Sequence, residues 1–189
     1  VVRSEERELD FLTQQQFHLL GAIGELPRVL ITGGAGTGKT VLAGHLAADL
    51  AKAGVKLLGE VGLGSVKAGA EAKTMVAWAR KYGIQSTIHT GGPSIPGSGL
   101  IDKDVVLEAD ADVIGHINGG HTALSEAHVC ELCERSSRAI EIVHNGNERV
   151  AIAAAKAAIE LRCPHRVILG TDGPAGSGVQ PLGILRMIA

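Results

Sequence analysis

Four residues whose side chains can bind a divalent metal lie at or near the ends of predicted strands. Glu60, His89, His116 and Asp172 each close an apolar run of strand length, and a glycine follows each within three residues. Imidazole nitrogens and carboxylate oxygens are common ligands of catalytic metals such as Zn²⁺ or Fe²⁺. The carboxyl ends of parallel strands meet at one edge of a sheet. We therefore predict that these four residues share one metal site.

Two of the four are carboxylates with different expected roles. Asp172, in a Gly-Thr-Asp-Gly-Pro turn, is placed to ligate metal and to take a proton from bound water. Glu60 interrupts the apolar run 57–61, and a buried carboxylate there is costly unless a cation or hydrogen bonds compensate it. Each residue alone could also have a purely structural role. A strand-end histidine often forms a hydrogen bond with a loop carbonyl, and Asp-Gly is a common turn sequence.

A second chemistry is present in a complete phosphate-binding motif, G-x-x-x-x-G-K-[ST], over residues 33–40. Its glycines, among them Gly33, Gly36 and Gly38, let backbone N–H groups turn toward phosphate oxygens. Lys39 then reaches the terminal phosphates, and the Thr40 hydroxyl binds Mg²⁺. An apolar segment precedes the motif and an amphipathic one follows it. The motif predicts ATP binding, with Mg²⁺.

Residues 12–53 resemble the start of helicase-like P-loop ATPases, in which Leu-Thr-x-x-Gln precedes the loop. The matching residues are Leu12, Thr13 and Gln16, and the resemblance implies that Gln16 reads adenine. Hydrolysis of ATP would also need an acidic Mg²⁺ partner at another strand end, for which Asp172 is the candidate.

The composition limits the partners of the chain. A formal net charge of -2 and an aromatic content of 2% give neither a basic surface nor stacking rings, so we expect no nucleic-acid partner. No apolar segment approaches the ~18 residues of a membrane-spanning helix. The three cysteines are an odd number in predicted helical sequence, which favours a reducing cytoplasm without disulfides.

Apolar runs of strand length alternate with segments of helical period, which is typical of an α/β fold with a mostly parallel sheet. The strands are predicted at residues 28–32, 55–61, 84–89, 112–117, 138–144 and 166–171. The helices are predicted at residues 40–53, 70–82, 102–109, 125–136 and 147–161. We expect the strand at 28–32 to pair beside that at 55–61, and the strand at 166–171 to be an edge through which the chain forms a homo-oligomer.

From about residue 58 onward the chain resembles the amidohydrolase superfamily, most closely the enamidases, which open a cyclic enamide ring. The matching stretches are 59–64, 89–98, 116–120 and 181–186. The resemblance implies a TIM-barrel-like sheet in which His89 and His116 bind one metal. It also implies that Asp172 binds a second metal and shuttles protons, and that Glu60 bridges the two.

The chain departs from that family in one respect. The family's first strand carries a His-x-His pair for the second metal, and this sequence has no such pair. With 189 residues against ~250 for a typical barrel, the chain is expected to form a partial barrel. We therefore predict a P-loop segment at residues 1–57 and a partial amidohydrolase barrel at residues 58–189.

Three functions remain open from the sequence. The first is metal-dependent hydrolysis of a small cyclic amide or related C–N bond, and the second is an ATP-binding or ATPase module. The third is an inactive chimeric or fragment fold. His121 and His144 are alternative ligands or substrate contacts. Cys130 and Cys133 are predicted to form a packed thiol pair rather than a metal site.

Overall fold

The computed structural model describes residues 39–64, 66–93, 95–173 and 183–188. The chain divides into two compact units, Val1–Lys56 and Leu57–Ala189. In the first unit the described element is helix α3, Lys39–Lys52, which begins at the last two residues of the phosphate-binding motif. The predicted strand at 28–32, Gln16 and the motif glycines lie outside the described residues.

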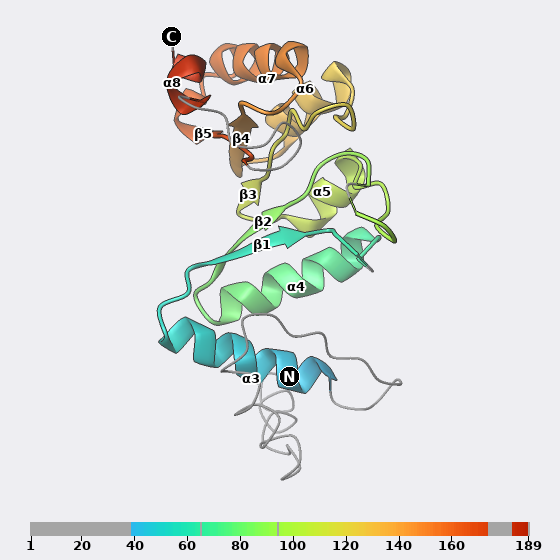
Figure 1. The fold of residues 1–189 in the computed structure, drawn as a ribbon, viewed down its shortest axis with the longest axis vertical. Helices are drawn as coiled ribbons and strands as arrows, with labels where there is room; N and C mark the ends of the chain where they lie inside the picture. Colours follow the sequence, from blue (N-terminus) through green and yellow to red (C-terminus); the bar gives the residue numbers. More distant parts are fainter. Residues whose placement is uncertain (1–38, 65, 94, 174–182, 189) are drawn as a thin grey trace. The chain divides into compact units, whose positions relative to one another are not determined.

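The second unit is built on five parallel strands in the order β1-β2-β3-β4-β5 (Figure 1). Sequence order and spatial order coincide, and each strand pairs in parallel with the next. The strands are β1 Leu57–Val61, β2 Gln85–Ile88, β3 Val113–Ile114, β4 Ala139–Val143 and β5 Val167–Gly170. This repeated strand-helix order is the arrangement of a TIM-barrel-like sheet, as predicted.

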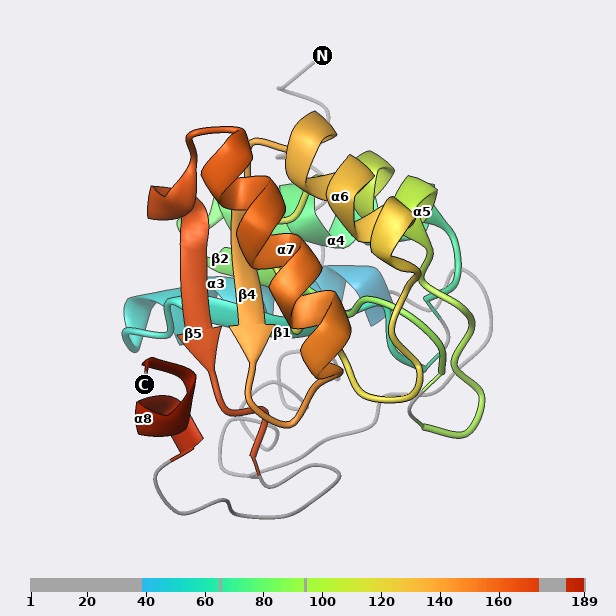
Figure 2. The same cartoon turned by 90° about the horizontal axis from the view of Figure 1, so that it is seen from above.

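A helix connects each strand to the next, so that helices α4 to α7 alternate with the strands along the chain (Figure 2). The helices of this unit are α4 Gly69–Lys81, α5 Lys103–Ala109, α6 Glu126–Arg135, α7 Glu148–Glu160 and α8 Gly183–Ile188, with a 3₁₀ turn at Pro164–Arg166 before β5. None of the described helices has the length and apolar character needed to cross a membrane.

The structure confirms five of the six predicted strands, each within its predicted range. β3 is the shortest, with two residues where six were predicted. The reason is local: His116 has a positive φ of 30°, which turns the chain out of the strand immediately after Gly115. Helices α3 to α7 match their predicted positions to within two residues at each end.

Polar side chains fix the beginnings of three helices where the sequence places good N-cap residues. The Asp102 carboxylate accepts hydrogen bonds from the N–H groups of Asp104 and Val105 at the start of α5. Ser125 and Asn147 cap α6 and α7 in the same way. These caps set where each helix begins, and therefore how long a loop separates it from the preceding strand end.

The core lies between one face of the sheet and the helices. Ile88, Ile114 and Ile140 on successive strands are fully buried and form a single cluster with residues of α4 to α7. Because side chains alternate along a strand, the residues between them face the other side of the sheet. Thr87, Val113 and Glu141 on that second face are only half-buried.

One buried asparagine ties the loop after β3 to the end of β4. The Asn118 side chain donates to the Val143 carbonyl at 2.9 Å and accepts from the Val143 N–H at 2.8 Å. At Gly146 a Cβ atom would lie 2.2 Å from the Asn118 amide nitrogen, so the loop needs glycine there. The Asn-Gly-Gly sequence after His116 is thereby held against the neighbouring strand.

Candidate metal centre

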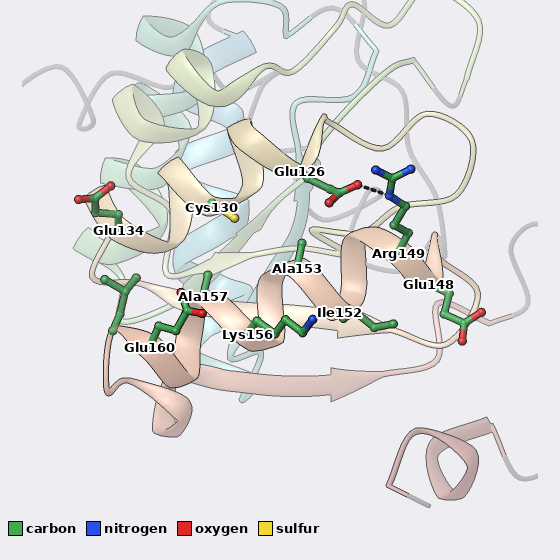
Figure 3. A pocket seen from close by; sticks show the side chains of 11 residues that line it. Glu126, Cys130, Glu134, Glu148, Arg149, Ile152, Ala153, Lys156, Ala157 and Glu160 are labelled. Carbon is green, nitrogen blue, oxygen red and sulfur yellow. Dashed lines mark ion pairs between the residues drawn. The ribbon is translucent and has the colours of Figure 1, made fainter.

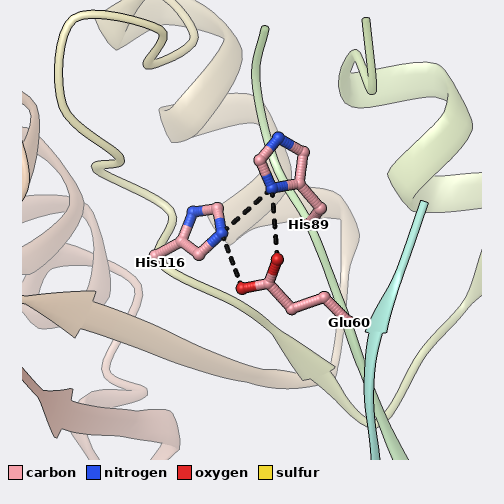
Figure 4. A group of neighbouring side chains, drawn as sticks. All are labelled: Glu60, His89 and His116. Atoms are coloured by element: carbon pink, nitrogen blue, oxygen red, sulfur yellow. Dashed lines mark hydrogen bonds and ion pairs between the residues drawn. The ribbon is translucent and has the colours of Figure 1, made fainter. Parts of the chain in front are cut away.

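Three of the four predicted ligands converge beyond the strand ends. Glu60 on β1, His89 after β2 and His116 after β3 each offer one ligand atom, and these atoms all lie within 4.8 Å of one another. Figure 4 shows the carboxylate and both imidazoles pointing toward one centre. The parallel pairing of three adjacent strands carries the three side chains to the same edge, and Glu60 lies where the register of β1 shifts between Leu58 and Val61.

The spacing of the donor atoms suits a metal ion. His116 Nε2 lies 3.0 Å from Glu60 Oε1 and 3.1 Å from His89 Nδ1. His89 Nδ1 lies 3.5 Å from Glu60 Oε2. Ligands about 2.05 Å from a tetrahedral Zn²⁺ are separated by about 3.3 Å. The donor atoms of the three residues are thus close enough to share one ion, and the N₂O donor set suits Zn²⁺ or Fe²⁺.

The orientation of His89 is fixed by its second nitrogen. Nε2 lies 2.9 Å from the Gly92 carbonyl oxygen, which can only accept a hydrogen bond. Nε2 therefore carries the proton, and Nδ1 presents its lone pair to the centre. A backbone carbonyl on the far nitrogen is a common way of fixing a metal-binding histidine. Gly91, with φ 101°, shapes the turn that brings this carbonyl back to the ring.

The electrostatics of the site favour a bound cation. Contact with the His116 imidazole, and then with that of His89, lowers the pKa of Glu60 to about 2. Burial opposes protonation of His116, but the hydrogen bond to Glu60 and the negative charges of Glu60 and Asp172 together raise the pKa of His116. A metal ion bound here would compete with a proton for His116 Nε2, because an imidazole must be deprotonated to bind metal.

Asp172 follows β5 and does not belong to the group of close ligand atoms. It is half-buried, has a φ of 51°, and its carbonyl accepts a hydrogen bond from the Asn145 side chain at 3.1 Å. Its carboxylate still acts on the centre, because its charge contributes to the raised pKa of His116.

The Glu60 carboxylate is more accessible than the sequence suggested. Its side chain is 30% exposed, whereas the His89 side chain is 3% exposed. The Glu60 side chain is therefore less buried than predicted. The physical reason is that β1 is the edge strand of the described sheet, so no further strand covers Glu60 on its outer side.

The alternative ligands named from the sequence lie elsewhere. His121 is exposed in the loop after β3 and His144 is half-buried after β4, and neither joins the close group. Cys133 is buried in the core, where burial raises the pKa of its thiol to about 11. Cys130, three residues earlier on α6, is exposed, so the two cysteines do not pack together in the core as predicted.

Two hollows of the second unit lie apart from the centre. A groove of about 750 Å³ runs between α6 and α7, where Glu126 and Arg149 form an ion pair (Figure 3). A cavity of about 600 Å³ is lined by residues that include Asn118, His144 and Met187. Neither is lined by Glu60, His89 or His116. The candidate site is therefore identified by the cluster of these three side chains and not by a cavity.

Sequence reasoning missed one residue that contacts the centre's ligands. Glu141 on β4 accepts a hydrogen bond from the His116 backbone N–H at 2.9 Å through its carboxylate. The signal was present, because Glu141 interrupts the apolar strand 139–143 just as Glu60 interrupts 57–61. It was overlooked because no glycine-rich turn follows it and it does not end its strand.

Comparison with known proteins places this geometry in context. The chain is 46% identical over 138 residues to enamidase of Eubacterium barkeri, which covers 73% of this chain and 36% of that protein. It also resembles the crystal structure of enamidase, described as a new member of the amidohydrolase superfamily. That likeness has a TM-score of 0.70 and 44% identity, over 76% of this chain and 37% of the enamidase chain. The chain thus spans little more than a third of the enamidase length. No protein family's sequence profile matches the chain.

We expect the protein to bind one Zn²⁺ or Fe²⁺ per chain, and a His89→Ala, His116→Ala double variant to bind it at least ~100-fold more weakly, since two ligands are lost. Affinity should rise with pH through the raised pKa of His116, because the metal must displace that proton. Competition titration with a chromophoric chelator measures both effects. The exposed His165→Ala is the matched control, and equal affinity in the double variant and the parent would contradict the site.

Proposed function

We propose that this chain, which is similar to enamidase over 138 residues, carries a metal-dependent hydrolytic site for the C–N bond of a cyclic amide. The observation that carries the proposal is the convergence of Glu60, His89 and His116, whose ligand atoms lie within 4.8 Å of one another. These residues lie in the part of the chain that folds as parallel strand-helix units, and the ends of such strands are where barrel enzymes place their chemistry.

A metal held by these three residues would supply Lewis acidity, polarising the substrate carbonyl and acidifying a water molecule. The chain's own residues would do the rest. His89, fixed by the Gly92 carbonyl, and His116 hold their lone pairs toward the ion. Glu60, ionised because of its low pKa, offsets the positive charge. The three protein ligands leave a position open for water or substrate.

Asp172 is the proposed general base and acid. Its carboxylate would take a proton from the attacking water and return it to the ring nitrogen as the C–N bond breaks, so that the proton count balances. Its electrostatic effect on His116 supports a position beside the centre. The described residues provide one close ligand group, so we propose a site with one metal in this chain.

Replacing Asp172 with Asn should lower the turnover of a cyclic enamide by about 10²–10⁴-fold, because proton transfer in the transition state is lost. Metal content should stay that of the parent, since Asp172 is outside the close ligand group. Ring opening of the metal-loaded protein is followed by the change in ultraviolet absorbance. The exposed Asp104→Asn is the control. A parent that hydrolyses no cyclic amide in the presence of metal would refute the proposed reaction.

Binding of Mg-ATP is a second proposed function, supported by one structural feature. Lys39 and Thr40 lie in helix α3, and a helix is what the phosphate-binding motif requires after its loop. The assignment of residues 1–57 as a P-loop segment and the role of Gln16 in adenine binding remain predictions from the sequence. They are independent of the metal centre.

Lys39→Ala should weaken Mg-ATP binding by at least ~1.5 kcal/mol, about tenfold, because a charge-assisted hydrogen bond to phosphate is lost. Calorimetric titration measures this directly. Lys52→Ala, at the exposed last turn of the same helix, is a matched control that should bind like the parent. Identical affinities for Lys39→Ala and Lys52→Ala would show that the motif is not used.

We also propose that β5 mediates self-association. It is the last strand of the described sheet, and Ile168 and Leu169 on it are 43% and 39% exposed. An edge strand with exposed apolar residues is a pairing surface for a second copy. Ile168→Lys should shift the protein to monomer in light scattering across a dilution series. Ile159→Lys, on the exposed face of α7, should not. A parent that is monomeric at every concentration would exclude self-association.

A further inference from the structure

His116 is held in an unusual backbone conformation. Its φ of 30° lies in the left-handed region that non-glycine residues rarely adopt, and such a residue persists only when its surroundings hold it there. The conformation matters for the centre, because it directs the imidazole away from the strand and toward Glu60 and His89. Something near His116 must therefore stabilise this turn of the chain.

The stabilising contacts come from Glu141 on the neighbouring strand. The His116 N–H donates to Glu141 Oε2 at 2.9 Å, and the Ile117 N–H donates to the Glu141 main-chain oxygen at 2.9 Å. One residue thus accepts from two successive amides at the point where β3 ends. The carboxylate substitutes for a backbone carbonyl at the position where the chain leaves the regular ladder.

The fold leaves room for this carboxylate. Glu141 lies on the half-buried face of β4 and pairs with Ile168 of β5, and its carboxylate reaches Gly170 two residues further along β5. A Cβ atom at position 170 would lie 2.5 Å from Glu141 Oε1, so any larger residue would displace the side chain. The lack of a side chain at Gly170 therefore leaves the space that the Glu141 carboxylate occupies.

The two histidines of the centre differ in what orients them. The far nitrogen of His89 bonds the Gly92 carbonyl, whereas His116 Nδ1 is buried with no hydrogen-bond partner in the described part of the chain. Apart from the contacts of its Nε2 with Glu60 and His89, the direction of the His116 ring therefore depends on its main chain. The geometry points to Glu141 as a positioning residue that sets the His116 imidazole for metal binding. This inference rests on the proposed metal site.

The test uses Zn²⁺ affinity and the absorption spectrum of Co²⁺-substituted protein. Glu141→Leu removes the acceptor at similar size and should weaken Zn²⁺ binding by about 10–100-fold, the usual effect of losing an outer partner of a ligand. Glu141→Gln keeps an acceptor oxygen and should stay within about threefold of the parent, with an unchanged Co²⁺ spectrum. Gly170→Ala keeps the carboxylate but displaces it, and should resemble Glu141→Leu. The exposed Glu160→Leu is the control.

A second measurement does not require metal. In the metal-free protein, the His116 amide should exchange with solvent at least tenfold faster in Glu141→Leu than in the parent. In Glu141→Gln it should exchange as slowly as in the parent. A parent that binds no metal but shows this exchange pattern refutes the metal site and leaves the positioning contact intact. Parent-like Zn²⁺ affinity in a folded Glu141→Leu overturns the inference. Equal losses in Glu141→Gln and Glu141→Leu also overturn it, because they would assign the effect to charge rather than to the hydrogen bond.

Discussion

The candidate site depends on the parallel pairing of β1, β2 and β3. Leu58 pairs with Ser86, and Ile88 pairs with Ile114, so the three strands run side by side with their carboxyl ends at one edge. Each strand contributes one donor there: Glu60 is the penultimate residue of β1, and His89 and His116 follow the last residues of β2 and β3. A slip of one residue between any two of these strands would move a donor by about 3.3 Å and turn it to the other face.

That pairing is held from both ends of the strands. At the amino ends, the Asp112 carboxylate before β3 accepts from the Ser86 N–H at 2.9 Å and from the Arg80 guanidinium at 2.9 Å. At the carboxyl ends, the buried Asn118 bridges to Val143. Exposed ion pairs such as that of Arg80 contribute little free energy each. Their effect here is to fix the relative positions of adjacent loops, while the isoleucine core supplies most of the stability.

The charges at the centre form a set that a divalent cation completes. An ionised carboxylate, an imidazole lone pair fixed by a loop carbonyl, and a second imidazole whose pKa is raised surround one point. Asp172 adds negative potential from a separate strand end. The similarity to enamidase extends over 138 residues of this chain and little more than a third of that protein.

The sequence by itself determined the strand-helix alternation and the identity of the three converging residues. Strand-length apolar runs and helical periodicity are local properties, and residues that end parallel strands must share an edge, so both could be predicted without coordinates. The tertiary structure alone decided three further matters. It placed Asp172 outside the close ligand group, exposed Glu60 on an edge strand, and put Glu141 beneath His116. These depend on how neighbouring strands stack and on a single left-handed residue, which no local pattern encodes.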